Sequence, residues 1–153
     1  MIVKSYELNK IKNNFIFFLF YRQNEGLKNQ LIKQLFENNI NNNVFKYEEK
    51  ERLENKDIFF ENILSNSLLE STKTIIINRS TDKICEIIID LMERNINDVK
   101  IIINAIVLEK KSKLRKLFEK EKNLTCIATY PDTDEILSNL AQDFFKKIKI
   151  SIS

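Results

Sequence analysis

The chain alternates short, continuous apolar runs with segments in which apolar residues recur at helical spacing. The continuous runs predict buried β-strands at residues 15–20, 75–77, 101–103 and 124–129, and residues 44–47 are a short strand candidate. The periodic segments predict amphipathic helices within residues 27–36, 58–64, 84–92, 114–118 and 136–148. Ser5 is expected to cap a further short helix that ends near Lys12.

This alternation predicts an α/β fold. Strands that are apolar throughout, separated by amphipathic helices, are typical of a parallel sheet covered on both faces. We expect a three-layer sandwich with about five mainly parallel strands. Residues 1–148 form the predicted domain, and residues 149–153 ("KISIS") are interpreted as the start of a link to a following domain.

Composition and charge narrow the class of protein only slightly. Of 153 residues, 43% are hydrophobic and 31% charged, and 25 basic against 22 acidic residues leave a net charge of +3, too mild to indicate nucleic-acid binding alone. No apolar run approaches the roughly 18 residues of a membrane span. Cys85 and Cys126 lie in apolar segments without metal-ligand spacing, so we expect buried structural cysteines in a reducing, cytoplasmic compartment.

The turn after the first predicted strand sits where a phosphate-binding loop would lie. Such a loop needs several glycines and a lysine followed by Ser or Thr. Here Tyr21 and Arg22 lead into a segment whose only glycine is Gly26, and Lys28 is followed by Asn29. The sequence therefore predicts a degenerate phosphate loop that binds no nucleotide. Gly26 is interpreted as a turn residue and Lys28 as a solvated helix lysine.

The residues that other kinds of catalysis require are also missing from the expected positions. Two later strands end in Asn78 and Asn104, where a magnesium-binding or phosphate-accepting carboxylate would be needed. The chain has no histidine, which removes the commonest general base and metal ligand. We therefore expect no intrinsic enzymatic activity and no cofactor or metal, and an active nucleotide hydrolase is kept only as a third interpretation.

Positive charge concentrates at the start of the helix predicted near residue 114. Basic residues at the start of a helix interact unfavourably with the helix dipole, so their presence there favours a binding role for the cluster. They could contact DNA or an acidic partner, or form an ordinary solvent-exposed helix face. The residues concerned are Lys110, Lys111, Lys113, Arg115 and Lys116.

Leu68 and Leu69 form an apolar pair in an otherwise polar segment, residues 65–73, just before a buried strand. Two large apolar side chains in such a setting are hard to bury within the domain. We predict that both leucines are exposed and that they anchor the domain in the pocket of a partner protein. The alternative is that one or both cover the edge of the sheet.

Four segments in this order resemble the amino-terminal domain of the delta subunit of bacterial DNA polymerase III, the clamp-loader wrench. They are "FLFYRQNEGLK" at 18–28, "NSLLESTKTIII" at 66–77, "LEKKSKLRKLFEK" at 108–120 and "CIATYPD" at 126–132. Together they span nearly the whole chain. The resemblance implies an AAA+-like fold that has lost ATPase function.

The resemblance also implies partners and a binding site. Members of this family bind the sliding clamp and help to open the ring, using a Leu-Phe pair that carries over to Leu68 and Leu69. Here Leu69 replaces the aromatic residue, and Arg22 stands where the family usually has glycine. Other clamp-loader subunits would be further partners and would supply ATP, with DNA contacted indirectly or weakly and no membrane. Nucleotidyltransferase activity of the polymerase would reside in other subunits. The alternative function is a nucleic-acid-binding α/β domain that uses residues 110–116.

Overall fold

The computed structural model describes residues 2–4, 7–11, 15–21, 25–37, 42–64, 72–94, 96, 99–128, 142 and 146. The described residues contain six strands: β1 (Ile2–Val3), β2 (Phe17–Tyr21), β3 (Asn42–Glu48), β4 (Thr72–Ser80), β5 (Val99–Ala105) and β6 (Leu124–Ala128). The helices are α1 (Leu8–Ile11), α2 (Glu25–Ile32), α3 (Glu49–Glu54), α4 (Lys56–Leu64), α5 (Cys85–Glu93) and α6 (Lys113–Lys120), with a π-helical turn η3 (Lys33–Glu37) and a 3-10 turn η4 (Asp82–Ile84). None of these described helices is long and apolar enough to cross a membrane.

The strands form a single parallel sheet in the order β1-β6-β2-β5-β4-β3. Strand β2 lies in the interior, between β6 and β5, and all five of its residues are buried. A strand covered on both faces needs apolar side chains on both, which explains its unbroken run of aromatic and aliphatic residues. The predicted α/β sandwich is thus confirmed. Strand β1 was not predicted, because two residues are too few to show a pattern.

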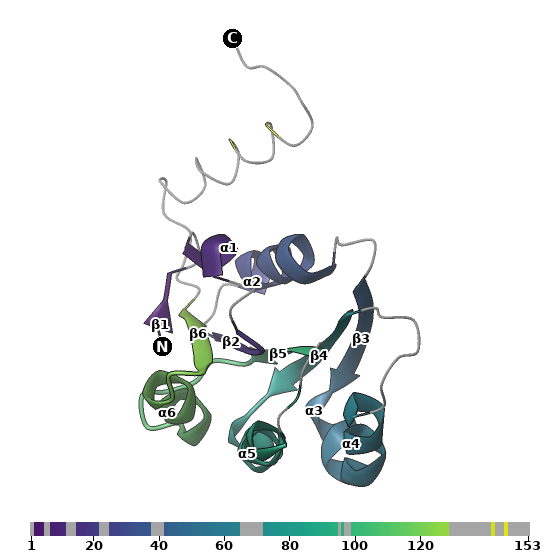
Figure 1. The fold of residues 1–153 in the computed structure, drawn as a ribbon. Coiled ribbons are helices and arrows are strands. Elements are labelled where there is room, and N and C mark those ends of the chain that lie inside the picture. The colour runs from purple at the N-terminus through teal and green to yellow at the C-terminus, as the bar shows by residue number, and fades with distance from the viewer. Residues whose placement is uncertain are drawn as a thin grey trace.

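Helices cover both faces of the sheet, as Figure 1 shows: α1 and α2 lie on one face, and α3, α4, α5 and α6 on the other. Side chains of β2 alternate between the two cores that result. Phe17, Leu19 and Tyr21 belong to the larger core. Phe18 and Phe20 belong to the smaller core, together with the buried residues of α2. This alternation follows from the two-residue period of an extended strand.

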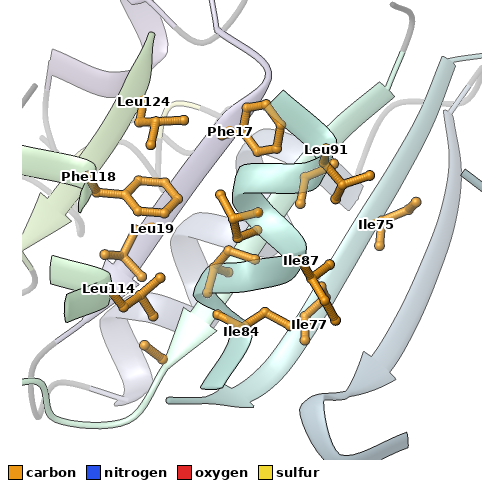
Figure 2. Packing of buried hydrophobic residues seen from close by; sticks show 14 of the residues in the cluster. Phe17, Leu19, Ile75, Ile77, Ile84, Ile87, Leu91, Leu114, Phe118 and Leu124 are labelled. Atoms are coloured by element: carbon orange, nitrogen blue, oxygen red, sulfur yellow. The ribbon is translucent and has the colours of Figure 1, made fainter. Parts of the chain in front are cut away.

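The larger core joins α5 and α6 to the sheet. Figure 2 shows Ile84 and Ile87 beside Ile77, and Phe118 beside Leu19. Each of these five side chains is at most 1% exposed. On the helices, such residues recur three or four positions apart, which places them on one face. The helices predicted within residues 84–92 and 114–118 are confirmed.

Some boundaries differ from the prediction. Strand β4 is nine residues long, and the segment after β3 forms the unpredicted helix α3, which follows the strand directly. The helix predicted within residues 27–36 consists of α2 and the π-helical turn η3. The link at 149–153 lies outside the described residues, and of the helix predicted at 136–148 only residues 142 and 146 are described.

Candidate functional site

The candidate site lies at the carboxyl ends of the central strands, where doubly wound sheets place their functional groups. Here β2 ends at Tyr21, and Asn78 of β4 is in register with Asn104 of β5. Asn104 is also in register with Phe20 of β2. Helix α2 starts at Glu25, shortly after β2, so its first turns lie beside these strand ends. The strand order therefore brings together three segments that are far apart in the sequence.

Lys28 is fully buried at this edge, so its interpretation as a solvated helix lysine is wrong. Its ammonium Nζ donates a hydrogen bond to the backbone oxygen of Ala105 at 2.7 Å and another to Oε1 of Glu25 at 2.6 Å. A buried ammonium is tolerated only where its hydrogens meet acceptors. The end of β5 and the first turn of α2 supply them. Sequence reasoning missed this because the carbonyl acceptor is 77 residues away.

Three asparagines form a neutral amide network beside Lys28. The side-chain nitrogen Nδ2 of Asn104 donates to Oδ1 of Asn78 at 3.0 Å, and more weakly to Oδ1 of Asn29 at 3.5 Å. The oxygen Oδ1 of Asn104 is buried and has no hydrogen-bond partner among the described residues. Amides at the strand ends can hold one another in place, but they cannot act as general bases or neutralise a divalent cation.

The remaining residues of the degenerate phosphate loop are placed as follows. Tyr21 is 1% exposed and belongs to the larger core. Gly26 lies in the first turn of α2, and no glycine in the described chain has a positive φ, so its interpretation as a turn residue is wrong. Arg22 lies outside the described residues. Where the structure describes the chain, no group of three or more His, Cys, Asp or Glu side chains could hold a metal ion.

The end of β4 contains an irregularity that the sequence did not reveal. Arg79 has a φ of 55°, in the left-handed region that is uncommon for residues other than glycine. The register with β5 shifts between Asn78 and Ser80, so that Ser80 pairs with Ala105. The hydroxyl of Ser80 donates back to the carbonyl of Ile77 at 3.0 Å and holds the bulge. A bulge of this kind redirects the strand end and its side chains.

Helix α6, which carries much of the basic cluster, has an acidic cap that sequence analysis did not identify. Ser112 is its N-cap, and the hydroxyl accepts a hydrogen bond from the backbone N–H of Arg115 at 3.2 Å. The carboxylate of Asp82 accepts from the Ser112 hydroxyl and from the backbone N–H groups of Lys113 and Leu114, both at 3.1 Å. A carboxylate in this place offsets the unfavourable interaction of the basic residues with the helix dipole.

These contacts also set the pKa of Asp82. Partial burial acts to raise the pKa of this carboxyl, but the hydrogen bonds from Ser112, Leu114 and Lys113 outweigh it. The pKa of Asp82 is therefore lowered from its ordinary value. The residue is 30 positions from Ser112 in the sequence, so no local capping pattern could have revealed it.

The basic cluster divides into exposed lysines and an arginine that faces the protein. Lys110, Lys111, Lys113 and Lys116 are exposed. The side chain of Arg115 is only 12% exposed. Because Arg115 faces the protein, only the four lysines of the cluster contribute to the exposed surface.

Arg115 is held by several contacts. Its Nε donates to Oε1 of Glu119 at 2.8 Å, and its Nη1 donates to the backbone oxygen of Leu108 at 3.4 Å. The guanidinium carbon lies 5.0 Å from the ring centroid of Tyr21, a cation–π distance. The hydrogen bond to Glu119 is the main reason that the pKa of Arg115 is raised. Arg115 thus braces α6 and the strand β2.

Leu68 and Leu69 lie outside the described residues, between the end of α4 and the start of β4. Their exposure therefore stays a prediction. A cavity of about 210 Å³ opens where α4 packs on β3 and β4. It is lined by Phe45, Tyr47, Phe59, Asn62, Ile63, Lys73 and Ile75. The sheet-edge alternative for the leucine pair can be tested against this cavity by experiment.

The prediction of buried cysteines is confirmed for Cys126, whereas Cys85 is only partly buried. Cys126 is 0% exposed and Cys85 is partly buried, and both are free thiols. Burial raises the pKa of Cys126 to about 12 and the pKa of Cys85 to about 11. Thiols with such values are protonated at neutral pH and are poor nucleophiles.

Comparisons with known proteins do not identify a family. No family model matches the sequence, and no curated protein matches it. The chemistry at the carboxyl edge of the sheet and the sequence resemblance of the four segments are therefore the two indications of function.

Proposed function

We propose that this chain is a non-hydrolysing binding domain of the clamp-loader delta type. It attaches to a ring-shaped sliding clamp through Leu68 and Leu69 and helps to open the ring during loading onto DNA. The burial of the Lys28 side chain is the observation that supports the absence of hydrolysis. Its ammonium hydrogen-bonds to Ala105 and Glu25 within the domain, instead of facing a site for phosphate.

The sheet supports this proposal in a second way. Asn78 and Asn104 end neighbouring strands and hydrogen-bond to each other at 3.0 Å. Their amides stand where a hydrolase of this architecture would hold magnesium through a carboxylate. A domain that keeps the α/β layout of a nucleotide hydrolase and fills its reaction edge with internal contacts is suited to binding a protein.

The free energy available from burying Leu68 and Leu69 is sufficient for such a contact. Burying two leucine side chains in a partner's pocket contributes on the order of 3 to 6 kcal/mol before the costs of association. Phe offers more apolar area than Leu, so Leu69 forms a smaller contact than the aromatic residue of the family pattern. The proposal therefore predicts that Leu69→Phe increases the affinity for the clamp.

The direct test is calorimetric titration of the chain with a sliding clamp from the same genome. The double variant Leu68→Ala, Leu69→Ala should lose at least 100-fold in affinity, because the apolar anchor is removed. Ile58, which is 56% exposed on α4, provides the matched control. Ile58→Ala removes a comparable apolar side chain and should leave the affinity within about twofold.

Thermal unfolding of the same variants separates clamp contact from the sheet-edge alternative. If the leucines fill the cavity beside α4, their truncation would lower the free energy of unfolding by about 2 kcal/mol or more for each. If they contact the clamp, stability should change by less than about 0.5 kcal/mol. Unchanged clamp affinity in the double variant would contradict the proposal.

Nucleotide titration addresses the remaining enzymatic interpretation. We expect no binding of ATP with magnesium, because Lys28 is engaged within the fold. Saturable binding in the micromolar range would overturn the non-hydrolysing assignment.

A nucleic-acid-binding domain remains the second candidate, and the exposed lysines 110, 111, 113 and 116 favour it. Four phosphate contacts predict that log K falls with log salt with a slope of about −3.6. Salt-insensitive binding to the clamp would favour the first proposal, and steep salt dependence of DNA binding would favour this one.

A further inference from the structure

The segment between β5 and α6, residues 106–112, presents two adjacent apolar side chains to solvent. Ile106 is 46% exposed and Val107 is 51% exposed. Single exposed apolar residues are common on protein surfaces, but two neighbours in one loop are a contact feature. Both are β-branched, so they have little side-chain entropy to lose on binding.

The backbone of this loop is anchored, so the exposure of the pair is a property of the fold. The N–H of Ile106 donates to the carbonyl of Ser80 at 3.2 Å, next to the bulge at the end of β4. Leu108 is buried, and its carbonyl accepts from the guanidinium of Arg115. Ser112, at the other end, is hydrogen-bonded to Asp82. A pre-ordered loop loses less conformational entropy when a partner binds.

Positively charged residues follow the apolar pair closely in the sequence. Residues 106–116 contain five basic residues and one acidic residue, Glu109, which gives a net charge of +4. Glu109 pairs with Lys111 at 3.2 Å, between exposed side chains. Among the described residues, Lys110 and Lys113 form no ion pair and are exposed. The loop thus combines an apolar centre with lysines that are available to a negatively charged partner.

We infer that the surface formed by Ile106, Val107, Lys110, Lys111 and Lys113, termed the β5–α6 surface, docks an acidic protein segment that carries apolar side chains. It follows the carboxyl end of β5, whereas the leucine pair precedes the amino end of the parallel neighbour β4, so it is a second interface beyond the proposed function. Charge complementarity would steer and orient the acidic segment, and burial of the apolar pair would supply affinity.

A protein partner fits this surface better than nucleic acid. A phosphate backbone provides no apolar surface for Ile106 and Val107, and its affinity comes from charge neutralisation. Arginine is the side chain best suited to bidentate phosphate contact. The arginine of this cluster, Arg115, is turned inward to Glu119 and Leu108.

Fluorescence anisotropy with three labelled probes tests the inference on the full chain. The first probe is a synthetic 16-residue helical peptide with glutamates on one face and leucines on the other. In the second probe every leucine is serine, so the charge is unchanged. The third probe is a 20-base-pair DNA duplex. We expect the leucine peptide to bind at least tenfold more tightly than the serine peptide and than the DNA.

Variants assign the binding to the β5–α6 surface. The double variant Ile106→Ser, Val107→Ser should lower the affinity for the leucine peptide at least tenfold. The double variant Lys110→Glu, Lys113→Glu should lower it by as much at 50 mM salt. The matched controls are Ile89→Ser, which alters another exposed apolar residue, and Lys33→Glu, which alters another exposed lysine. Both controls should leave the affinity within twofold, and circular-dichroism melting should show every variant folded.

Several outcomes would overturn the inference. They are absence of binding by the leucine peptide, equal affinity for the two peptides, or no effect of the Ile106 and Val107 substitutions. Tighter binding of DNA that depends on Lys110 and Lys113 alone would assign the surface to nucleic acid instead. The clamp proposal is tested apart from this, because Leu68→Ala with Leu69→Ala should leave peptide binding unchanged.

Discussion

Two lysine-bearing regions follow strands of the same sheet, yet they use their charges in opposite ways. Lys28, after β2, is fully buried and hydrogen-bonds to a backbone carbonyl and a carboxylate. Lys110 and Lys113, after β5, are exposed. The sequence suggested a solvated residue in the first case and a uniform basic cluster in the second. The comparison shows that the acceptors near a lysine decide whether its charge is used inside the fold or at the surface.

The difference arises from the backbone around each region. Helix α2 packs over the strand ends, so the long side chain of Lys28 reaches the carbonyl of Ala105. In the second region, Asp82 and Leu108 anchor the loop instead, and Arg115 takes the inward position. Among the described residues, Lys110 and Lys113 beside it form no ion pair.

The largest expected effect is at Lys28. Lys28→Ala removes a buried side chain and leaves the carbonyl of Ala105 without this donor, so we expect the free energy of unfolding to fall by about 3 kcal/mol. Lys28→Met keeps most of the packing and should cost about half as much, roughly 1.5 kcal/mol. Urea denaturation measures both.

Lys33 provides the matched control for this experiment, because it is an exposed lysine one and a half turns further along the same helical segment. Lys33→Ala should change stability by less than about 0.5 kcal/mol. A similar small change for Lys28→Ala would mean that its buried hydrogen bonds contribute nothing to the fold.

The cap of α6 should show an intermediate effect. Asp82→Asn keeps the size of the side chain but weakens its hydrogen bonds to Ser112, Lys113 and Leu114, so we expect a loss of about 1 kcal/mol. Thermal unfolding at pH 7 measures it. Asp90, which is exposed on α5 and takes no part in the caps of that helix, gives the control variant Asp90→Asn, which should be close to neutral.

The same cap predicts a pH dependence. The pKa of Asp82 is lowered in the folded state, so its contribution is complete above the unfolded value of about 4. As the pH falls through the folded pKa, the carboxylate is protonated and the contribution is lost. The stability difference between the wild type and Asp82→Asn should therefore shrink as the pH falls from 5 to 2. A constant difference over this range would rule out the charged cap.

The exposed lysines should affect stability least. Lys110→Ala with Lys113→Ala removes two solvated charges and should shift the free energy of unfolding by less than about 0.5 kcal/mol. A loss comparable to that of Lys28→Ala would show that these lysines support the fold, and the contrast between the two regions would disappear.

The thiols extend the comparison to groups that burial keeps uncharged. Because burial raises the pKa of Cys85 to about 11 and that of Cys126 to about 12, neither is a thiolate at pH 8. Iodoacetamide should label neither within an hour in the folded protein, and both in urea. Rapid labelling of Cys85 alone would indicate local opening at the start of α5.

Patterns with a short period were predictable from the sequence, and contacts between distant segments were not. The continuous apolar run of β2 and the helical spacing in α5 and α6 are local patterns, so those elements were found. The burial of Lys28 and the cap from Asp82 depend on partners 77 and 30 residues away. The bulge at Arg79 arises from the register with β5, which no single strand encodes.

The two edge strands of the sheet differ in length, and this difference bears on which edge could pair with a strand of another molecule. Strand β1 is only two residues long, so it offers a very short edge beyond β6. Strand β3, at the other edge, is seven residues long and places Phe45 partly in solvent. Its neighbour Lys46 is exposed and pairs with Glu37, and a charged side chain on an edge strand disfavours addition of another strand. We therefore expect Lys46 to disfavour edge-to-edge aggregation during folding and at high concentration.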